Sequence, residues 1–194
     1  VLSSYQHATA HVIHSATPRK VFVRVLDWLD KNVGFDLYNE VSQIHPSVQI
    51  GPNVVIESGC IIEENVVIEP NVVIHKGTII KKGSRIRSSA SVGSDGFGFE
   101  RMGDNQTIRF AHLGRVILGE NVEIGACTTV ARGTLSDTVI GNNVKIDNLV
   151  HVAHNVRVGD GALITACAEI SGSVEVGENV WISPNVSIRE KLKI

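Results

Sequence analysis

A histidine, an aspartate and a glycine in the second half of the chain could together perform general base chemistry. His154 follows Asp147 by seven residues and precedes Gly172 by eighteen. An imidazole titrates near neutral pH and can take a proton from a nucleophile, while a carboxylate holds its second nitrogen. A glycine stacked over that ring would leave room for a substrate and offer a backbone N–H to a developing oxyanion. The combination suits acyl transfer, with a solvated surface histidine as the alternative.

A repeat of six residues supplies the stacking that this chemistry needs. Such a period fits neither an α-helix nor an ordinary hairpin stack, and it is typical of a hexapeptide β-helix. Three repeats make one coil of eighteen residues, so His154 and Gly172 are predicted to lie one coil apart in a three-sided prism of seven coils. The aliphatic positions are Ile44, Ile50, Ile56, Ile62, Ile68, Ile74, Ile80, Ile86 and Val92, then Leu118, Ile124 and Val130, then Ile140, Ile146, Val152, Val158, Ile164, Ile170, Val176, Ile182, Ile188 and Ile194.

The repeat divides the chain into two parts. Residues 44–194 are predicted to form the prism, interrupted by loops near residues 94–113 and 131–138. Loops that leave a rigid scaffold are frequent places for a site. Residues 1–43 lack the repeat and are predicted to form a small α/β segment, which could be a truncated nucleotide-binding domain.

Two local patterns fill in this outline. In the N-terminal segment we expect a short strand over residues 10–13 and a helix that begins at Pro18 and ends near Gly34. In the prism, the second position of a repeat is often glycine, which tolerates the backbone geometry of a tight corner. These glycines are Gly51, Gly93, Gly119, Gly125, Gly141, Gly159 and Gly177. The chain begins at Val1 and stops within a repeat, so we expect a longer natural protein.

Composition excludes several kinds of partner. The formal net charge of −2 gives no footprint for nucleic acid. No apolar stretch is long enough to span a membrane, so we expect no membrane insertion. The three cysteines, Cys60, Cys127 and Cys167, are expected to be buried reduced thiols of a cytoplasmic protein.

Two other readings of the same fold remain open at this point. Some β-helix enzymes are carbonic anhydrases that bind zinc through three histidines, and His112, His151 and His154 are the candidates here. Because His151 and His154 should diverge from adjacent faces of one coil, we predict no metal site. The other reading is a prism that serves as a non-catalytic scaffold.

Several motifs together resemble a known enzyme family. They resemble the UDP-3-O-(3-hydroxyacyl)glucosamine N-acyltransferases of lipid A synthesis, and also related enzymes that acylate other nucleotide-linked amino sugars. The resemblance covers most of residues 44–180, and residues 17–22 are similar to the end of that family's uridine-binding domain. The motifs are Ser94–Phe99 (SDGFGF), His112–Ile117 (HLGRVI), Val122–Thr129 (VEIGACTT), Ala131–Gly133 (ARG), Ile146–Asn148 (IDN) and Ala153–Val156 (AHNV).

The resemblance implies an all-β fold, a left-handed parallel β-helix, in a homotrimer with active sites between subunits. It implies transfer of an acyl group from acyl-CoA or acyl-carrier protein to a nucleotide-linked amino sugar, for lipopolysaccharide or another surface glycan, with no tightly bound cofactor. In that family's terms His154 is the general base, Asp147 its acid and Gly172 the N–H donor to the oxyanion. The implied substrate-binding residues are Asp95, Gly96, Phe97, Gly98 and Phe99 of the loop, together with Asn148, His151 and Asn155.

Two departures from that family bear on the substrate. Lys191 stands where those enzymes carry a second functional histidine, and the N-terminal segment is short for a complete uridine domain. Both departures favour a smaller acyl donor, such as a short acyl-CoA, and a different nucleotide sugar. They leave the reaction class unchanged.

Overall fold

The computed structural model describes residues 13–103 and 105–194, which form two compact units. One unit combines the described residues up to Phe35 with those of Gly98–Ala111, and the other combines Asp36–Phe97 with His112–Ile194. Residues 10–12 of the strand expected at the N-terminus lie outside the described residues.

The first unit consists of a helix and a two-stranded hairpin. Helix α1 spans Pro18–Asn32 and has its proline in the first turn. Strands β10 (Phe99–Arg101) and β11 (Thr107–Arg109) pair antiparallel. The helix ends at Asn32, and the predicted stop residue Gly34 follows with φ +77° and donates its N–H to the carbonyl of Leu29 at 2.9 Å. The hairpin therefore comes from the loop that the repeat pattern marks as an interruption.

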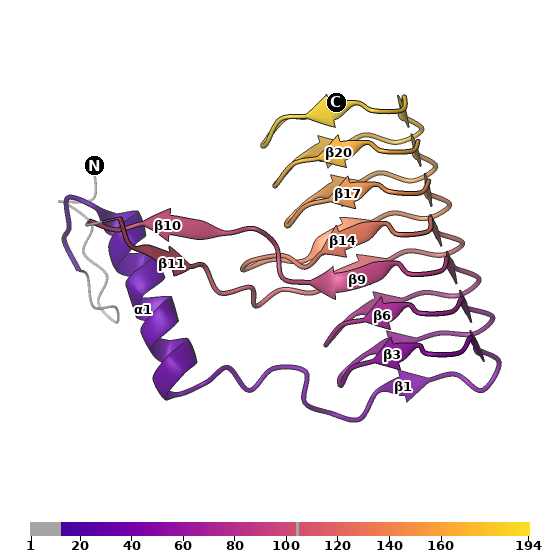
Figure 1. Ribbon diagram of the computed structural model, residues 1–194, viewed down its shortest axis with the longest axis horizontal. Helices are drawn as coiled ribbons and strands as arrows, with labels where there is room; N and C mark the ends of the chain where they lie inside the picture. The colour runs from indigo at the N-terminus through magenta and orange to yellow at the C-terminus, as the bar shows by residue number, and fades with distance from the viewer. Residues whose placement is uncertain (1–12, 104) are drawn as a thin grey trace, which may run out of the picture. The chain divides into compact units, whose positions relative to one another are not determined.

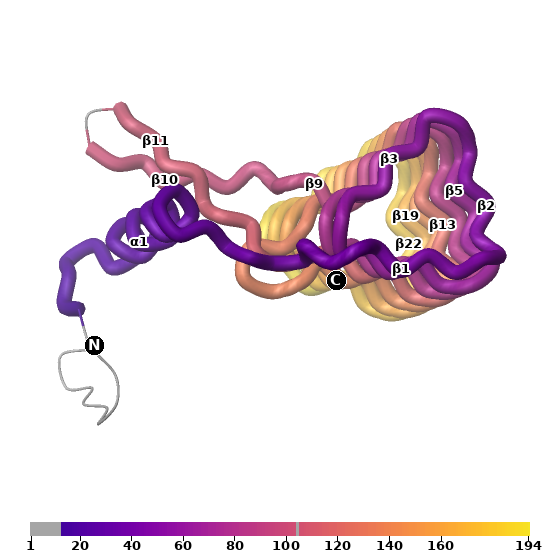
Figure 2. The backbone as a smooth tube through the Cα atoms, turned by 90° about the horizontal axis from the view of Figure 1, so that it is seen from below, coloured from indigo at the N-terminus to yellow at the C-terminus, as the bar shows by residue number. Residues whose placement is uncertain are grey.

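The second unit is a three-faced parallel β-helix, seen along its stack in Figure 2 and from the side in Figure 1. Each face, named A, B or C here, is a parallel sheet of seven strands. Face A contains β1 (Gln43–Ile44), β4 (Ile61–Ile62), β7 (Ile79–Ile80), β12 (Val116–Leu118), β15 (Thr138–Ile140), β18 (Arg157–Val158) and β21 (Glu175–Val176). Face B contains β2 (Gln49–Ile50), β5 (Val67–Ile68), β8 (Arg85–Ile86), β13 (Glu123–Ile124), β16 (Lys145–Ile146), β19 (Leu163–Ile164) and β22 (Trp181–Ile182). Face C contains β3 (Val55–Ile56), β6 (Val73–Ile74), β9 (Ser91–Ser94), β14 (Thr129–Ala131), β17 (His151–Val152), β20 (Glu169–Ile170) and β23 (Ser187–Ile188).

The aliphatic repeat forms the core of this unit. Where no loop intervenes, each strand pairs in register with the strand eighteen residues away, so Ile62 lies beside Ile80 and Ile146 beside Ile164. These side chains are 2% exposed or less, because each coil covers the next. The prediction of a hexapeptide-repeat, left-handed parallel β-helix is confirmed, and helix α1 is the described element of the predicted N-terminal α/β segment.

The corners need glycine for a different reason from the one expected. Apart from Gly93, the second-position glycines do not have positive φ. A Cβ on Gly125 would instead lie 2.2 Å from the carbonyl carbon of Asp147 on the next coil. The left-handed conformation occurs two residues later and is often adopted by asparagine, as at Asn53 (φ 56°) and Asn143 (φ 57°).

The cysteines correct another prediction. Cys60 is buried in the core, and burial raises the pKa of its thiol. Cys127 and Cys167 are exposed, because they occupy left-handed corner positions with φ 57° and 61° where the side chain leaves the prism. All three are free thiols.

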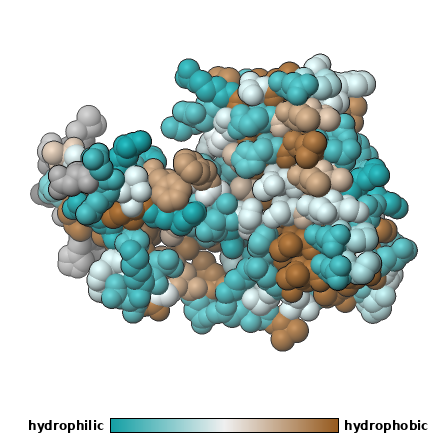
Figure 3. Space-filling view, in the orientation of Figure 1, coloured by the Kyte–Doolittle hydropathy of each residue, from teal (hydrophilic) through white to brown (hydrophobic). Residues whose placement is uncertain are grey.

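The surface of the β-helix carries both polar and exposed apolar side chains. Polar residues cover much of the face in Figure 3, with apolar patches between them. Trp181 on face B is 70% exposed and Leu149 at a corner is 61% exposed. Across the described part of the chain, no helix has the length and apolar character to span a membrane.

Candidate active site at a corner of the β-helix

His154 lies at the corner after β17, on the edge between faces C and A, and close neighbours surround its ring. Its Nδ1 is 2.9 Å from Oδ1 of Asn155. A Cβ on Gly172 would lie 2.8 Å from Cε1 and 3.0 Å from Nε2 of the ring. A Cβ on Gly96 would lie 3.0 Å from both Cβ and Cδ2 of His154. The structure thus brings Gly172 and the loop glycine Gly96 onto two sides of the imidazole, where any larger residue would collide with it.

The backbone N–H of Gly172 is open to a ligand. At six equivalent positions of the β-helix, a side chain from an adjacent coil accepts the corresponding N–H. Among the described residues nothing accepts the N–H of Gly172, and Ala153 occupies the position from which a glutamate would reach it. The capped pairs are Lys76 with Glu57, Lys82 with Glu63, Ser88 with Glu69, Glu120 with Asn142, Ala126 with Asn148, and Asn142 with Asp160. An N–H donor that no described residue accepts, beside a ring nitrogen, is an arrangement that can stabilise an oxyanion.

A second imidazole packs against the first. The rings of His112 and His154 meet edge to face, with centroids 5.6 Å apart and an interplanar angle of 75°. His112 is 8% exposed, and a Cβ on Gly96 would lie 2.9 Å from its Nε2. Gly96 therefore lets the loop approach both rings at once.

The other residues of the predicted sugar loop are spread along it. Asp95 and Phe97 are exposed, and Phe97 has 87% of its surface accessible. Gly98 and Phe99 belong to the first unit, where the guanidinium of Arg109 lies 4.7 Å from the centroid of the Phe99 ring. Gly96 is thus the loop residue that the structure brings against His154.

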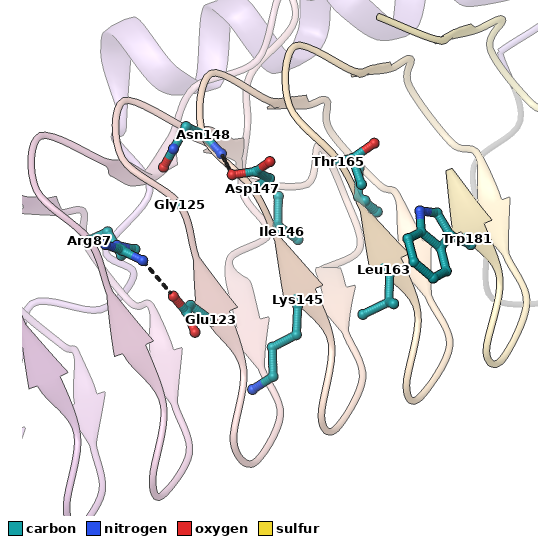
Figure 4. Close-up of a pocket in the computed structure, with 11 residues that line it drawn as sticks. Arg87, Glu123, Gly125, Lys145, Ile146, Asp147, Asn148, Leu163, Thr165 and Trp181 are labelled. Carbon is teal, nitrogen blue, oxygen red and sulfur yellow. Dashed lines mark hydrogen bonds and ion pairs between the residues drawn. The ribbon is translucent and has the colours of Figure 1, made fainter. Parts of the chain in front are cut away.

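Asp147 and Asn148 lie at a different corner from His154. They follow β16 on face B and line a groove of about 250 Å³. Figure 4 shows them with Lys145 and with Leu163 and Trp181, which lie on adjacent coils of that face. Oδ1 of Asp147 accepts the N–H of Asn148 at 2.7 Å, and Oδ1 of Asn148 accepts the N–H of Ala126 at 2.7 Å. Sequence reasoning paired Asp147 with a ring nitrogen of His154. Within one chain, the residue that lies against Nδ1 of that ring is Asn155.

His151 and Lys191 complete the predicted set. His151 is exposed on β17, between Thr129 and Glu169 of the neighbouring strands of face C. Lys191 lies one coil beyond Gly172 and donates its backbone N–H to the Gly172 carbonyl at 3.1 Å. Its backbone thus borders the candidate site.

The described residues contain no group of three or more His, Cys, Asp or Glu side chains that could hold a metal ion. His112 and His154 are adjacent, but the described structure adds no third ligand to them. The geometry is that of an imidazole base beside an N–H donor.

Sequence reasoning missed two contributors to this site. His112 was considered as a metal ligand and as the start of a family motif but not as a contact of His154, although it ends the long loop where the chain re-enters the repeat. Ala153 was overlooked, although Glu57, Glu63 and Glu69 at the same position of other repeats are a readable signal.

Comparison with known proteins shows which families the chain is similar to. The family described as bacterial transferase hexapeptide (six repeats) matches residues 41–76, 59–94 and 137–172. A UDP-3-O-acylglucosamine N-acyltransferase of Coxiella burnetii is 52% identical over 86 residues, covering 44% of this chain and 25% of that protein. The Hahella chejuensis protein of the same name is 46% identical over 108 residues, covering 55% and 30%.

Solved structures share the fold. The UDP-N-acetylglucosamine acyltransferase of Francisella novicida superposes with a TM-score of 0.61 at 25% identity, covering 78% of this chain and 60% of that one. The Arabidopsis UDP-N-acetylglucosamine acyltransferase has a TM-score of 0.57 at 18% identity, covering 79% and 62%. The chain spans less than a third of the length of the curated relatives it matches. Over the matched residues it is a hexapeptide-repeat protein similar to the UDP-3-O-acylglucosamine N-acyltransferases, and the resemblance predicted from its motifs is confirmed.

Proposed function

We propose that the protein is an N-acyltransferase that moves an acyl group from a thioester to the amino group of a nucleotide-activated amino sugar. The product would enter lipopolysaccharide or another surface glycan. The observation that carries the proposal is the pairing of His154 with the open N–H of Gly172. The similarity to UDP-3-O-acylglucosamine N-acyltransferases supports the choice of an amino-sugar acceptor.

The reaction needs one proton acceptor and one oxyanion donor. As the amine nitrogen of the sugar bonds to the thioester carbonyl carbon, His154 takes a proton from that nitrogen. The carbonyl oxygen becomes an oxyanion, which the N–H of Gly172 stabilises. The C–S bond then breaks, and the proton on His154 passes to the leaving sulfur. An amide and a free thiol result.

We propose a homotrimer because Asp147 and His154 lie at different corners of one chain. Asp147 borders the groove on face B, whereas His154 lies between faces C and A. Packing face B of one copy against the His154 edge of the next would place the carboxylate of Asp147 near the imidazole. In this arrangement Asn148 and His151 would line the substrate cleft together with Asp95 and Phe97.

The acyl donor is proposed to be acyl-CoA or acyl-carrier protein, used as a co-substrate. We place the reaction in the cytoplasm, because Cys60, Cys127 and Cys167 are all free thiols, as expected in a reducing compartment.

Mass spectrometry of paired substrates tests the proposal. A panel of nucleotide-linked amino sugars would be incubated with acetyl-CoA, longer acyl-CoA species or acyl-carrier protein. We expect amide product and free thiol only when both substrates are present. We expect His154→Ala to reduce kcat by about 10²–10⁴, the usual contribution of a general base. Thioester consumption without an amino sugar, or a His154→Ala variant as fast as the wild type, would contradict the proposal.

A further inference from the structure

The side-chain amide of Asn155 has only one orientation that satisfies its neighbours. Its Oδ1 lies 3.2 Å from the backbone N of Thr134 and 2.8 Å from Oγ1 of the same residue. Its Nδ2 lies 2.9 Å from the carbonyl oxygen of Ser136. A peptide N–H can only donate and a carbonyl oxygen can only accept. The atom facing Thr134 must therefore be the oxygen, and the atom facing Ser136 must be the NH₂ group.

This orientation assigns the proton on His154. Because Oδ1 of Asn155 can only accept, Nδ1 of the ring, 2.9 Å away, must be the donor. A neutral imidazole carries a single N–H, so Nε2 keeps its lone pair. Nε2 is also on the side of the ring that faces Gly172, where the oxyanion would form.

We propose that Asn155 is a positioning residue that holds His154 in the Nδ1–H tautomer and so makes Nε2 the basic atom. The importance of this tautomer for catalysis rests on the function proposed above, whereas the tautomer itself follows from the hydrogen bonds. Sequence reasoning placed Asn155 among the substrate-binding residues. In the structure its amide is instead engaged by His154 on one side and by the 131–138 insertion on the other.

The insertion over residues 131–138 is what orients the amide. It departs from the six-residue repeat and folds back, so that Thr134 and Ser136 reach Asn155 from the preceding coil. A side chain on Gly133 would collide with the carbonyl of Ser136, so this fold requires glycine there. The hydroxyl of Thr138 also accepts the backbone N–H of Asn155 at 2.8 Å. The loop therefore acts on the base through one amide.

Nitrogen NMR of histidine-labelled full-length chain tests the tautomer directly. The His154 signals would be assigned by their loss in His154→Gln and recorded at a pH above the midpoint of the ring. We expect a protonated Nδ1 and an unprotonated Nε2 in the wild type. In Asn155→Gly, which tolerates the φ of 62°, we expect the two nitrogens to share the proton. In Asn155→Asp, which keeps the acceptor, we expect Nδ1–H to persist.

Kinetics give a second, separate readout. We expect Asn155→Gly to lower kcat by about 10- to 100-fold with little change in KM, because part of the population still carries the useful tautomer. Asn155→Asp should recover much of that loss. Asn185→Gly is the matched control, since Asn185 is an exposed left-handed asparagine (φ 58°) at a different corner.

The two proposals fail in different ways. A wild-type ring protonated on Nε2, or an Nδ1–H that is unchanged in Asn155→Gly, overturns the role of Asn155 whatever the enzyme transfers. The expected nitrogen shifts in a protein that acylates no amino sugar would uphold the tautomer and overturn the proposed function.

Discussion

Two corners on the edge between faces C and A have equivalent positions but differ in how one backbone N–H is used. In the lower corner, Oε2 of Glu57 accepts the N–H of Lys76 from the next coil at 2.9 Å. In the upper corner, Ala153 stands in the position of Glu57 and Gly172 in the position of Lys76, and among the described residues nothing accepts that N–H. The candidate site is thus built largely by leaving out a cap that the scaffold supplies elsewhere.

The two corners also differ at the position that follows Glu57 in one and Ala153 in the other. Ser58 occupies in the lower corner the position that His154 occupies in the upper one. The upper corner thus has a base, an open N–H and a glycine that leaves space for a substrate. A repeated backbone provides many such donors, and a few side chains decide which of them a ligand can reach.

The largest loss of kcat is expected from giving the upper corner a side chain that accepts the N–H of Gly172, as Glu57 does for Lys76 in the lower corner. In Ala153→Gln, the new side chain should accept the N–H of Gly172 as Glu57 accepts that of Lys76, without adding charge near His154. Loss of one oxyanion donor typically costs about 10²–10³ in kcat. We therefore expect a loss of that size with unchanged thermal stability. Steady-state kinetics and a melting curve would check it.

Ala153→Ser is the control for this experiment, since its hydroxyl is too short to span the coils in the same way. It should retain most of the activity. If Ala153→Gln turned over as fast as the wild type while remaining folded, the open N–H of Gly172 would have no part in the reaction.

A smaller effect is expected from His112, the second imidazole of the upper corner. His112 contacts His154 edge to face, and aromatic pairs of this kind are worth about 0.5–1.5 kcal/mol. We expect His112→Ala to loosen the ring of His154 and lower kcat by roughly two- to tenfold, and His112→Phe to retain most of the activity because it keeps an aromatic edge. Equal losses in both variants would mean that His112 acts through its nitrogens and not through packing.

The fold was predictable because each repeat meets the same environment. Ile62 and Ile146 occupy equivalent inward positions, so a period of six is enough to infer coils, faces and the offset of eighteen between His154 and Gly172. The exposed thiols of Cys127 and Cys167 were mispredicted, because the direction of a corner side chain depends on a left-handed residue that the apolar pattern does not reveal.

The site was less predictable where the chain leaves the repeat. Thr134 and Ser136 lie in an insertion whose path no periodicity specifies, so their hold on Asn155 could not be inferred. His112 and Gly96 come together from the two ends of a long excursion for the same reason. The pairing of Asp147 with His154 was inferred from separation along the chain, but the two residues follow strands of different faces.

The smallest expected effect concerns a cap far from the site. Glu69 accepts the backbone N–H of Ser88 at 3.2 Å and pairs with Arg85 at 3.0 Å. Partial desolvation raises the pKa of Glu69, but the hydrogen bonds from Ser88 and Arg85 and the charge of Arg87 outweigh it and lower the pKa below its ordinary value of 4.5. A lowered pKa means that the carboxylate stabilises the fold at pH values above 4.5, and that this contribution is lost as the pH falls through the value in the folded protein.

We therefore expect Glu69→Gln to be less stable than the wild type by about 1 kcal/mol at neutral pH, from the weakened hydrogen bonds to a charged group. The difference should shrink as the pH is lowered below 4.5, because the wild-type side chain then becomes neutral as well. Denaturant unfolding of both proteins at several pH values would measure it. A gap that persisted in acid would show that the charge of Glu69 contributes nothing, and kcat should be the same in both proteins because this corner carries no base.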